Sequence, residues 1–296
     1  MHDSGADKGG GTPNFPVPSP VVVAVPHAGR FYPPALLTQS RLTPEQLALL
    51  EDRFADALVG DLHDSPHQLL VAETARAWID LNRDPREIDP AMIARNDPGL
   101  AQARLEARAC DPSKTRAGLG LLPSRVPRIG DIYRERLTLN DIHARVATVH
   151  TVWHQGIEQA MHAAWVAHGV AILVDLHSMP SIPRGQSGHG LRLVVGDRHG
   201  QSCDTSLAGC AVTLSRKAGL AADRNRPYAG AYTLARHGRP SQHFHAIQLE
   251  FDRALYLDDT GEMMITKVQD LRLLLRQLCD TLADIGWGLT TAQAAE

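Results

Sequence analysis

Four short polar segments, each set directly against an apolar run, carry the side chains that could do chemistry. They contain His27 in VVVAVPHAG, Asn82 and Arg83 in WIDLNR, His177 in AILVDLHS and Glu250 in HAIQLEFDR. Apolar runs of this length are typical of buried parallel strands, and ligands of open α/β sheets bind at the edge where such strands end. Imidazoles, carboxylates, an arginine and an amide at one edge predict a metal-assisted hydrolase with a pocket for a substrate carboxylate.

His27 and His177 are the candidate metal ligands. A neutral imidazole fixed at the end of a strand is a good zinc ligand. Asp175 lies two residues before His177, so both side chains would point to one face of an extended strand, where the carboxylate could orient the imidazole. Two alternatives stay open: the chain has 15 histidines, most of which need no such role, and Asp175 could simply cap the turn after a strand.

Glu250 is the candidate general base. A carboxylate inside the apolar segment AIQLEFD is costly to bury without a partner or a task, and taking a proton from a metal-bound water is such a task. A salt-bridged glutamate on an edge strand is the alternative. The residues alone leave the third metal ligand open, since four acidic side chains are available: Asp52, Asp56, Asp61 and Glu73.

Asn82 and Arg83 suit the capture of a substrate carboxylate, because a guanidinium can bind both carboxylate oxygens. The alternative is a structural ion pair between Arg83 and Asp80, Asp84 or Asp89. The sequence contains no HExxH motif, no phosphate-binding glycine loop and no GxSxG nucleophile motif. It therefore lacks the local signatures of several common hydrolase classes.

The order of elements predicts an α/β fold, a three-layer sandwich around a mostly parallel mixed central sheet. Strands are expected at residues 20–26, within LLVAETARAWIDLNR up to Arg83, at AILVD, at LRLVVGD and at AIQLEFD. Helices are expected from Thr43 through Leu58, from Leu139 to His168 with Gly169 as C-cap, from Ser206 to Ala218, and from Gly261 to about Ile285.

Three details of this arrangement bear on the site. Asp52 and Asp56, four residues apart, would share one face of the first helix. Gly196 and Asp197, which end LRLVVGD, are expected at the same sheet edge as the histidines. Residues 84–135, rich in Pro, Arg, Asp and Gly, are expected to form binding loops rather than a separate core.

The composition is that of an ordinary globular protein, 43% hydrophobic and 21% charged. A formal net charge of −3 gives no broad basic field, so nucleic acid is not an expected partner. No apolar run is long enough to cross a bilayer, and four scattered cysteines without a CxxC pair fit a reducing cytoplasm. Residues 1–18 are expected to be a disordered tail and residues 19–290 a single metallohydrolase domain; the oligomeric state is left open.

Taken together and in order, these segments resemble the N-formylglutamate amidohydrolase family. The likeness is carried by PHAGRFYPP, ARAWIDLNR, VDLHSMPSIP, GDRHGQSCD and RPYAGAYTLARHGRPSQHFHAIQLEFDRALYLD, and it runs from about residue 20 to the terminal helix. The resemblance implies a zinc-exopeptidase-like fold and hydrolysis of an N-acyl group from an amino acid, above all N-formyl-L-glutamate to formate and L-glutamate. Related N-acyl amino acids, short peptides and a noncatalytic binding role are the alternatives.

The resemblance also implies roles for particular residues. His27 and His177 would hold one zinc ion per chain, with Asp52 of the stretch EDRFAD as carboxylate ligand and Glu250 as base. Phe54 departs from the family, which often has histidine there, and this leaves the substrate uncertain. On the substrate side, the resemblance implies five residues: Arg76, Asn82, Arg83, Arg145 and His154.

Overall fold

A six-stranded mixed sheet forms the centre of the computed structural model, which describes residues 19–182 and 190–293. The strands lie in the order β2-β1-β5-β8-β6-β7, with β1 at Val21–Val25, β2 at Gln68–Val71, β5 at Ala171–Met179, β6 at Leu193–Gly196, β7 at Ala222–Arg224 and β8 at Phe244–Asp252. All neighbouring pairs are parallel except β6 and β8. The predicted, mostly parallel sheet is confirmed.

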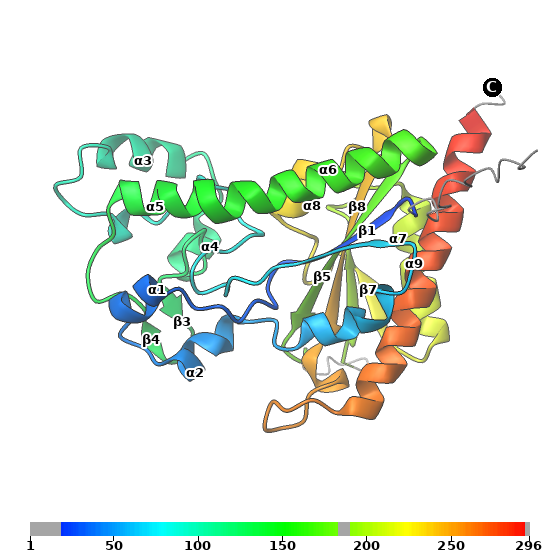
Figure 1. Cartoon of the computed structure of the whole chain (residues 1–296), viewed down its shortest axis with the longest axis horizontal. Coiled ribbons are helices and arrows are strands. Elements are labelled where there is room, and N and C mark those ends of the chain that lie inside the picture. The colour runs from blue at the N-terminus through cyan, green and yellow to red at the C-terminus, as the bar shows by residue number, and fades with distance from the viewer. Residues whose placement is uncertain (1–18, 183–189, 294–296) are drawn as a thin grey trace, which may run out of the picture.

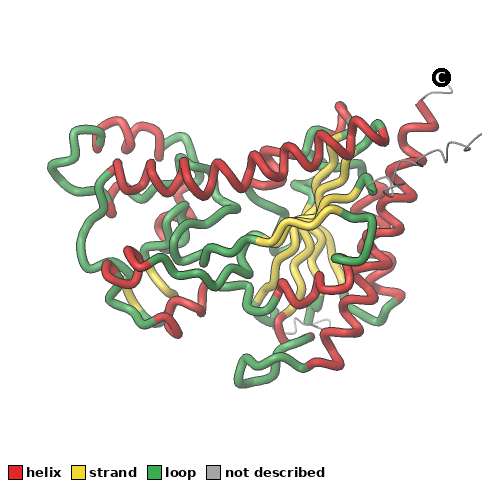
Figure 2. Tube along the Cα trace, in the orientation of Figure 1, coloured by secondary structure: helices red, strands yellow, loops and turns green. Residues whose placement is uncertain are grey.

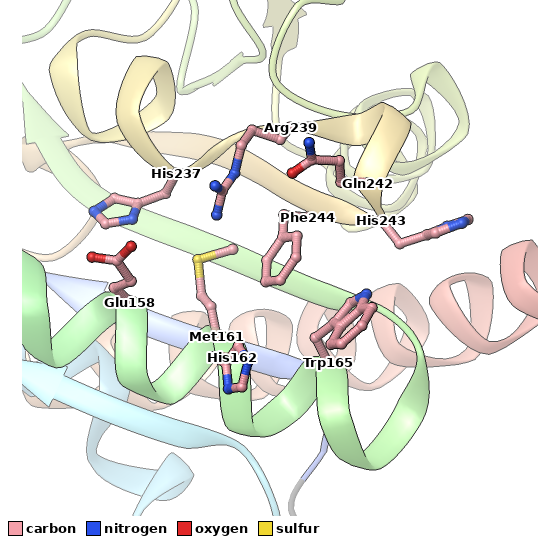
Figure 3. Close-up of a pocket in the computed structure, with 9 residues that line it drawn as sticks. All are labelled: Glu158, Met161, His162, Trp165, His237, Arg239, Gln242, His243 and Phe244. Carbon is pink, nitrogen blue, oxygen red and sulfur yellow. The ribbon is translucent and has the colours of Figure 1, made fainter.

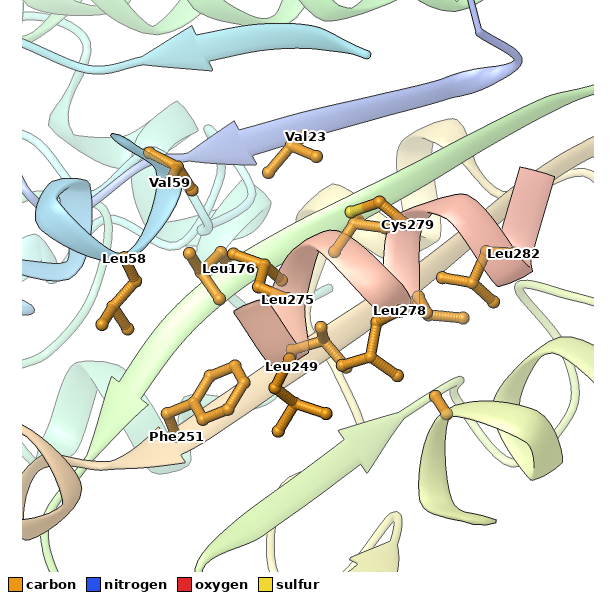
Figure 4. Packing of buried hydrophobic residues seen from close by; sticks show 14 of the residues in the cluster. Val23, Leu58, Val59, Leu176, Leu249, Phe251, Leu275, Leu278, Cys279 and Leu282 are labelled. Carbon is orange, nitrogen blue, oxygen red and sulfur yellow. The ribbon is translucent and has the colours of Figure 1, made fainter. Parts of the chain in front are cut away.

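Helices cover both faces of this sheet, which gives the predicted three layers (Figures 1 and 2). The 3-10 helix η2 (Ala55–Leu62), α7 (Thr205–Lys217) and α9 (Ile265–Gln293) pack on one face, and α6 (Thr151–His168) and α8 (Tyr232–His237) pack on the other. Figure 4 shows Leu249 and Phe251 of β8 against Leu275 and Leu278 of α9. Both faces of β5 and β8 are buried, which explains why their sequences are mostly apolar.

The helical run predicted from Leu139 to His168 is confirmed. It consists of α5 (Leu139–Arg145), one π-helical turn (Val146–His150) and α6, and Gly169 ends it in the left-handed conformation with φ of 72°. The helix predicted after Ser206 is α7, which begins where the Asp204 side chain accepts the backbone N–H of that serine. The terminal helix starts later than predicted, because Asp258 first closes a turn with Thr260.

The helix predicted from Thr43 through Leu58 is wrong beyond its first turn. After α2 (Pro44–Leu47) and a 3-10 turn (Ala48–Leu50), the chain becomes extended at Glu51 and left-handed at Phe54, before η2 begins. The backbone N–H of Asp52 donates to the carbonyl of His27 at 3.0 Å instead of to a helical carbonyl. Asp52 and Asp56 therefore do not share a helix face.

Two strand predictions also need correction. In LLVAETARAWIDLNR only β2 is a strand, and residues 72–83 form turns, one of them closed by the Asp80 carboxylate accepting the N–H of Asn82. Strand β6 runs antiparallel to β8, so its end at Gly196 pairs with Gln248 and leads Asp197 away from the edge of the histidines. There Asp197 accepts a hydrogen bond from Nε of Arg224 at 2.8 Å.

Residues 84–135, called the lobe below, contain α3 (Leu100–Ala107), α4 (Pro112–Arg116), β3 (Arg125–Val126) and β4 (Gly130–Asp131). Together with α1 (Pro34–Gln39), the lobe lies beside the sheet, on the side away from α9 (Figure 1). The expectation of loops without a core is wrong, because two buried apolar clusters include lobe residues such as Met92, Leu121 and Ile132. Many short elements bury these residues without any long periodic pattern.

Among the described residues, no helix combines the length and apolar character that a membrane span requires. The tail predicted at residues 1–18 lies outside the described residues. That residues 19–290 form one domain stays a prediction.

Candidate metal centre and pocket

Three side chains from distant segments converge where β1 and β5 end. His27 follows β1, Asp52 lies in the bend before η2, and His177 lies in β5; all three are buried. One ligand atom of each lies within 4.8 Å of the others. Gly29 lets the turn after β1 lie close to the backbone at Thr74. A Cβ at position 29 would meet the carbonyl oxygen of Thr74 at 2.3 Å. The sequence expectation that His27 and His177 meet at a sheet edge agrees with this geometry.

Each imidazole is oriented by a carboxylate that contacts its Nε2 atom, on the side of the ring opposite Asp52. Nε2 of His27 donates to Asp80 Oδ1 at 2.8 Å, and Nε2 of His177 donates to Asp175 Oδ2 at 3.0 Å. Each Nδ1 faces Asp52 Oδ2, at 3.4 Å from His27 and 3.0 Å from His177, and in the neutral imidazole with its proton on Nε2 each Nδ1 offers a lone pair to a metal ion. Among the residues that the structure describes, Nδ1 of His27 is buried without a hydrogen-bond partner. Carboxylate-oriented imidazoles with free nitrogens beside a carboxylate are a donor set that fits a divalent metal.

The electrostatics of the cluster favour a cation. Burial opposes ionisation of Asp52, but the neighbouring imidazoles of His177 and His27 hold the pKa of its carboxyl well below the usual range. Burial likewise opposes a charge on His177, yet Asp175 and Asp52 raise the pKa of its imidazole well above the usual range. Buried carboxylates need a compensating positive charge, which a proton or a metal ion can supply.

Asp52 is the acidic candidate that geometry brings to the histidines. Asp56 instead binds Arg30 at the surface, and Asp61 lies 3.4 Å from Arg272. The sequence missed Arg253, which follows β8 and whose Nη2 donates to Asp52 Oδ1 at 3.1 Å. The sequence signal that could have identified Arg253 is its position directly after the strand segment LEFD.

Glu250 lies on β8 directly beside His177 on β5. It is buried among apolar strands, and this burial raises the pKa of its carboxyl to about 7, although the nearby His177 opposes the shift. Nε2 of Gln248 donates to Glu250 Oε1 at 2.8 Å. A carboxyl group with a pKa near neutrality can both accept and return a proton.

A cavity of about 430 Å³ opens onto this cluster. Its lining includes the three candidate ligands and Glu250, together with cationic and amide side chains from the turn at residues 76–83, the lobe and the end of β8: Arg76, Asn82, Arg83, Lys114, Gln248 and Arg253. The sequence expectation for Arg76, Asn82 and Arg83 thus agrees with their position at the pocket. Asn82 and Arg83 lie in a turn, however, and not at a strand end.

The family model described as N-formylglutamate amidohydrolase matches residues 19–257 of this chain. The chain belongs to the N-formylglutamate amidohydrolase family. It is 25% identical over 279 residues to the N-formylglutamate deformylase of Pseudomonas aeruginosa, covering 91% of this chain and 94% of that protein. The corresponding protein of Pseudomonas putida is 24% identical over 286 residues, with 91% and 93% covered.

A solved N-formylglutamate amidohydrolase from Ralstonia eutropha JMP134 has the same fold, with a TM-score of 0.79 and 30% identity over 90% of this chain and 94% of that one. The family resemblance read from the sequence is confirmed. As a member of an amidohydrolase family, the protein is an enzyme that acts on an amide bond.

Two residues that the family resemblance assigned to the substrate do not line the pocket. Arg145 is 2% exposed, stacks its guanidinium on Trp78 and donates to Tyr133 and Gln39. His154 is buried and donates Nε2–H to the carbonyl of Leu81 at 2.9 Å. Because both side chains are used within the protein interior, this geometry does not support the expected substrate contacts of Arg145 and His154, which stay a prediction.

His154 and His150 nevertheless affect the pocket indirectly, because both rings donate to backbone carbonyls of the turn that carries Asn82 and Arg83. Nε2–H of His150 donates to the carbonyl of Arg83 at 2.9 Å, and the backbone N–H of Thr233 donates to Asn82 Oδ1 at 2.9 Å. Burial lowers the pKa of His154 to about 2 and also lowers that of His150, so both rings are neutral donors. These bonds fix the turn at residues 81–83, which presents Asn82 and Arg83 to the pocket.

A second cavity, of about 580 Å³, lies between α6 and the start of β8 (Figure 3). Trp165 and Phe244 stack there with ring centroids 5.8 Å apart, and Arg239 lies over Phe244. Although this cavity is larger, its lining contains none of the candidate metal ligands. The smaller cavity is the better candidate for catalysis, since the acidic and imidazole groups meet there.

Proposed function

We propose that the protein hydrolyses N-formyl-L-glutamate to formate and L-glutamate, with one zinc ion held by His27, Asp52 and His177. The observation that carries the proposal is the convergence of these three side chains beside Glu250, in a pocket lined by cations. The names of the relatives from both Pseudomonas species support the substrate, and the two imidazoles with a carboxylate support zinc.

When bound, the metal supplies Lewis-acid chemistry by polarising a carbonyl oxygen and making water more acidic. Glu250 is suited to take the proton of the attacking water, because burial raises the pKa of its carboxyl to about 7. The water oxygen adds to the formyl carbon, the bond between carbon and nitrogen breaks, and Glu250 returns the proton to the leaving amine. Asn82 and Arg83 hold the α-carboxylate of the substrate and orient the formamide.

The experiment that tests this proposal measures formate release from N-formyl-L-glutamate by the zinc-loaded protein. We expect formate release that stops when a chelator removes the metal and returns when zinc is restored. N-acetyl-L-glutamate serves as the comparison substrate and is expected to react much more slowly. If the protein binds one zinc ion per chain but releases no formate or acetate from either compound, the proposed substrate is rejected and the metal site is kept.

Loss of the His150 side chain is expected to weaken substrate binding more than turnover. His150→Ala leaves the carbonyl of Arg83 without its donor, so we expect KM to rise about 10-fold with a smaller change in kcat. His150→Gln, which can still donate an N–H, should restore part of the effect. Steady-state kinetics test this, with His162→Ala on the exposed side of α6 as the control. A lower melting temperature with unchanged KM would mean that His150 only stabilises the fold.

We further propose that residues 19–290 act as one domain and that the protein works in the cytoplasm. The family match over residues 19–257 supports the first statement. Four free cysteines support the second, because disulfides do not persist in reducing compartments.

A further inference from the structure

Four long cationic side chains line the pocket, and three of them are already engaged. Nε of Arg76 donates to Asp80 Oδ2 at 2.8 Å. Nε of Arg83 donates to the carbonyl of Leu119 at 3.0 Å. Arg253 binds Asp52. Each of these three side chains has at least one donor committed to the protein itself, although a guanidinium has further N–H groups that can bind a ligand.

The fourth cation, Lys114 of α4, differs from the others. Within residues 19–182 and 190–293, its ammonium group has neither an ion-pair nor a hydrogen-bond partner. The nearest acidic residue on its own helix turn, Asp111, caps α4 by accepting the N–H of Ser113. Asp80, the carboxylate nearest the arginines, is occupied by Arg76 and His27. Within the described residues, Lys114 is thus a pocket cation that no carboxylate contacts directly, although Asp80 and Glu250 lie near enough to act on its charge.

The surroundings of Lys114 favour an anion beside it. Partial burial lowers the pKa of its ammonium group, and the positive charges of Arg83 and Arg76 lower it further, whereas Asp80 and Glu250 raise it. Cations that repel one another across a pocket are stabilised when an anion enters between them. The positive charges of Arg83, Arg76 and Lys114 therefore favour an anionic ligand beside Lys114.

The depth of these residues indicates which part of the substrate reaches Lys114. Asn82 and Arg83 are buried, whereas Lys114 is exposed and comes from the lobe, so it lies at the outer part of the pocket. In N-formylglutamate the formamide and the α-carboxylate share one carbon and must both lie deep, near the candidate ligands. The γ-carboxylate is the group that extends outwards.

We infer that Lys114 binds the side-chain carboxylate of the substrate and thereby sets the preference for an acidic amino acid. This inference rests on the proposed function. The ammonium of Lys114 donates to the γ-carboxylate, while Asn82 and Arg83 serve the α-carboxylate. Lys114 is a specificity-determining residue and takes no part in proton transfer.

The test compares N-formyl-L-glutamate with N-formyl-L-glutamine, which has nearly the same shape but no side-chain charge. For Lys114→Met we expect kcat/KM to fall about 10- to 100-fold on the glutamate substrate and to change less than about 2-fold on the glutamine substrate, mostly through KM. Lys114→Arg should keep most of the preference. Arg116→Met is the matched control, since it removes one positive charge from the same helix outside the pocket.

Equal losses on both substrates in Lys114→Met, or equal effects of Lys114→Met and Arg116→Met, would overturn the inference. A ratio of kcat/KM between the glutamate and glutamine substrates that is the same in Lys114→Met as in the wild-type protein would also overturn it. The proposed function fails in a different way, in which the zinc-loaded wild-type protein releases formate from neither compound, and the role of Lys114 then falls with it. Circular dichroism of each variant checks that the fold is kept.

Discussion

Glu250→Gln is expected to lower kcat about 10²- to 10⁴-fold while the protein still binds one zinc ion per chain. The substitution keeps the shape of the side chain and its place beside Gln248, but an amide cannot accept a proton at neutral pH. His27, Asp52 and His177 remain intact, so metal binding should not change. Turnover of N-formyl-L-glutamate and zinc content measured on the same samples test this.

Glu51→Gln is the matched control for this experiment. Glu51 is a buried glutamate next to Asp52, but it is hydrogen-bonded to Tyr32 and does not line the pocket. We expect it to keep most of the activity. If Glu250→Gln lost its zinc while staying folded, Glu250 would be a metal ligand; if it kept full activity, the base would have to be another group.

The sequence predicted the histidines of the site well, because their placement depends on local patterns. An apolar run predicts a buried strand, and parallel strands end at one edge, which brings His27 and His177 together. Alternation along a strand likewise predicted the contact between Asp175 and His177. The pairing of His177 with Glu250 across β5 and β8 was not predicted, because local patterns give neither the order nor the register of the strands.

What the sequence could not predict depends on contacts between distant segments. The residues alone left Asp52 equal to Asp56, because the apolar spacing indicated a helix that in fact breaks at Glu51. The break results from the hydrogen bond of the Asp52 backbone to His27, which no local pattern reveals. Asp80 was considered only as a partner of Arg83, but it also orients His27.

The lobe illustrates the same limit. Its elements are only two to eight residues long, too short to show periodicity, although Leu121 and Ile132 are fully buried. Charged side chains in such segments give no sign of depth. Only Arg145 was expected to contact the substrate, yet Arg145 is enclosed by Trp78 and Tyr133, whereas Lys114 faces the pocket.

Asp52→Asn is expected to weaken zinc binding by at least about 100-fold, more than the loss of an outer carboxylate such as Asp80, for which about 10- to 100-fold is typical. Asp52 is the carboxylate that both free Nδ1 atoms face, and an amide oxygen lacks the charge that balances the cation. Asp56→Asn, the same change four residues away in the surface pair with Arg30, should leave zinc affinity unaltered. Competition with a chromophoric chelator measures the zinc affinity of both variants. If Asp56→Asn lost zinc and Asp52→Asn kept it, the carboxylate ligand would be assigned to the wrong residue.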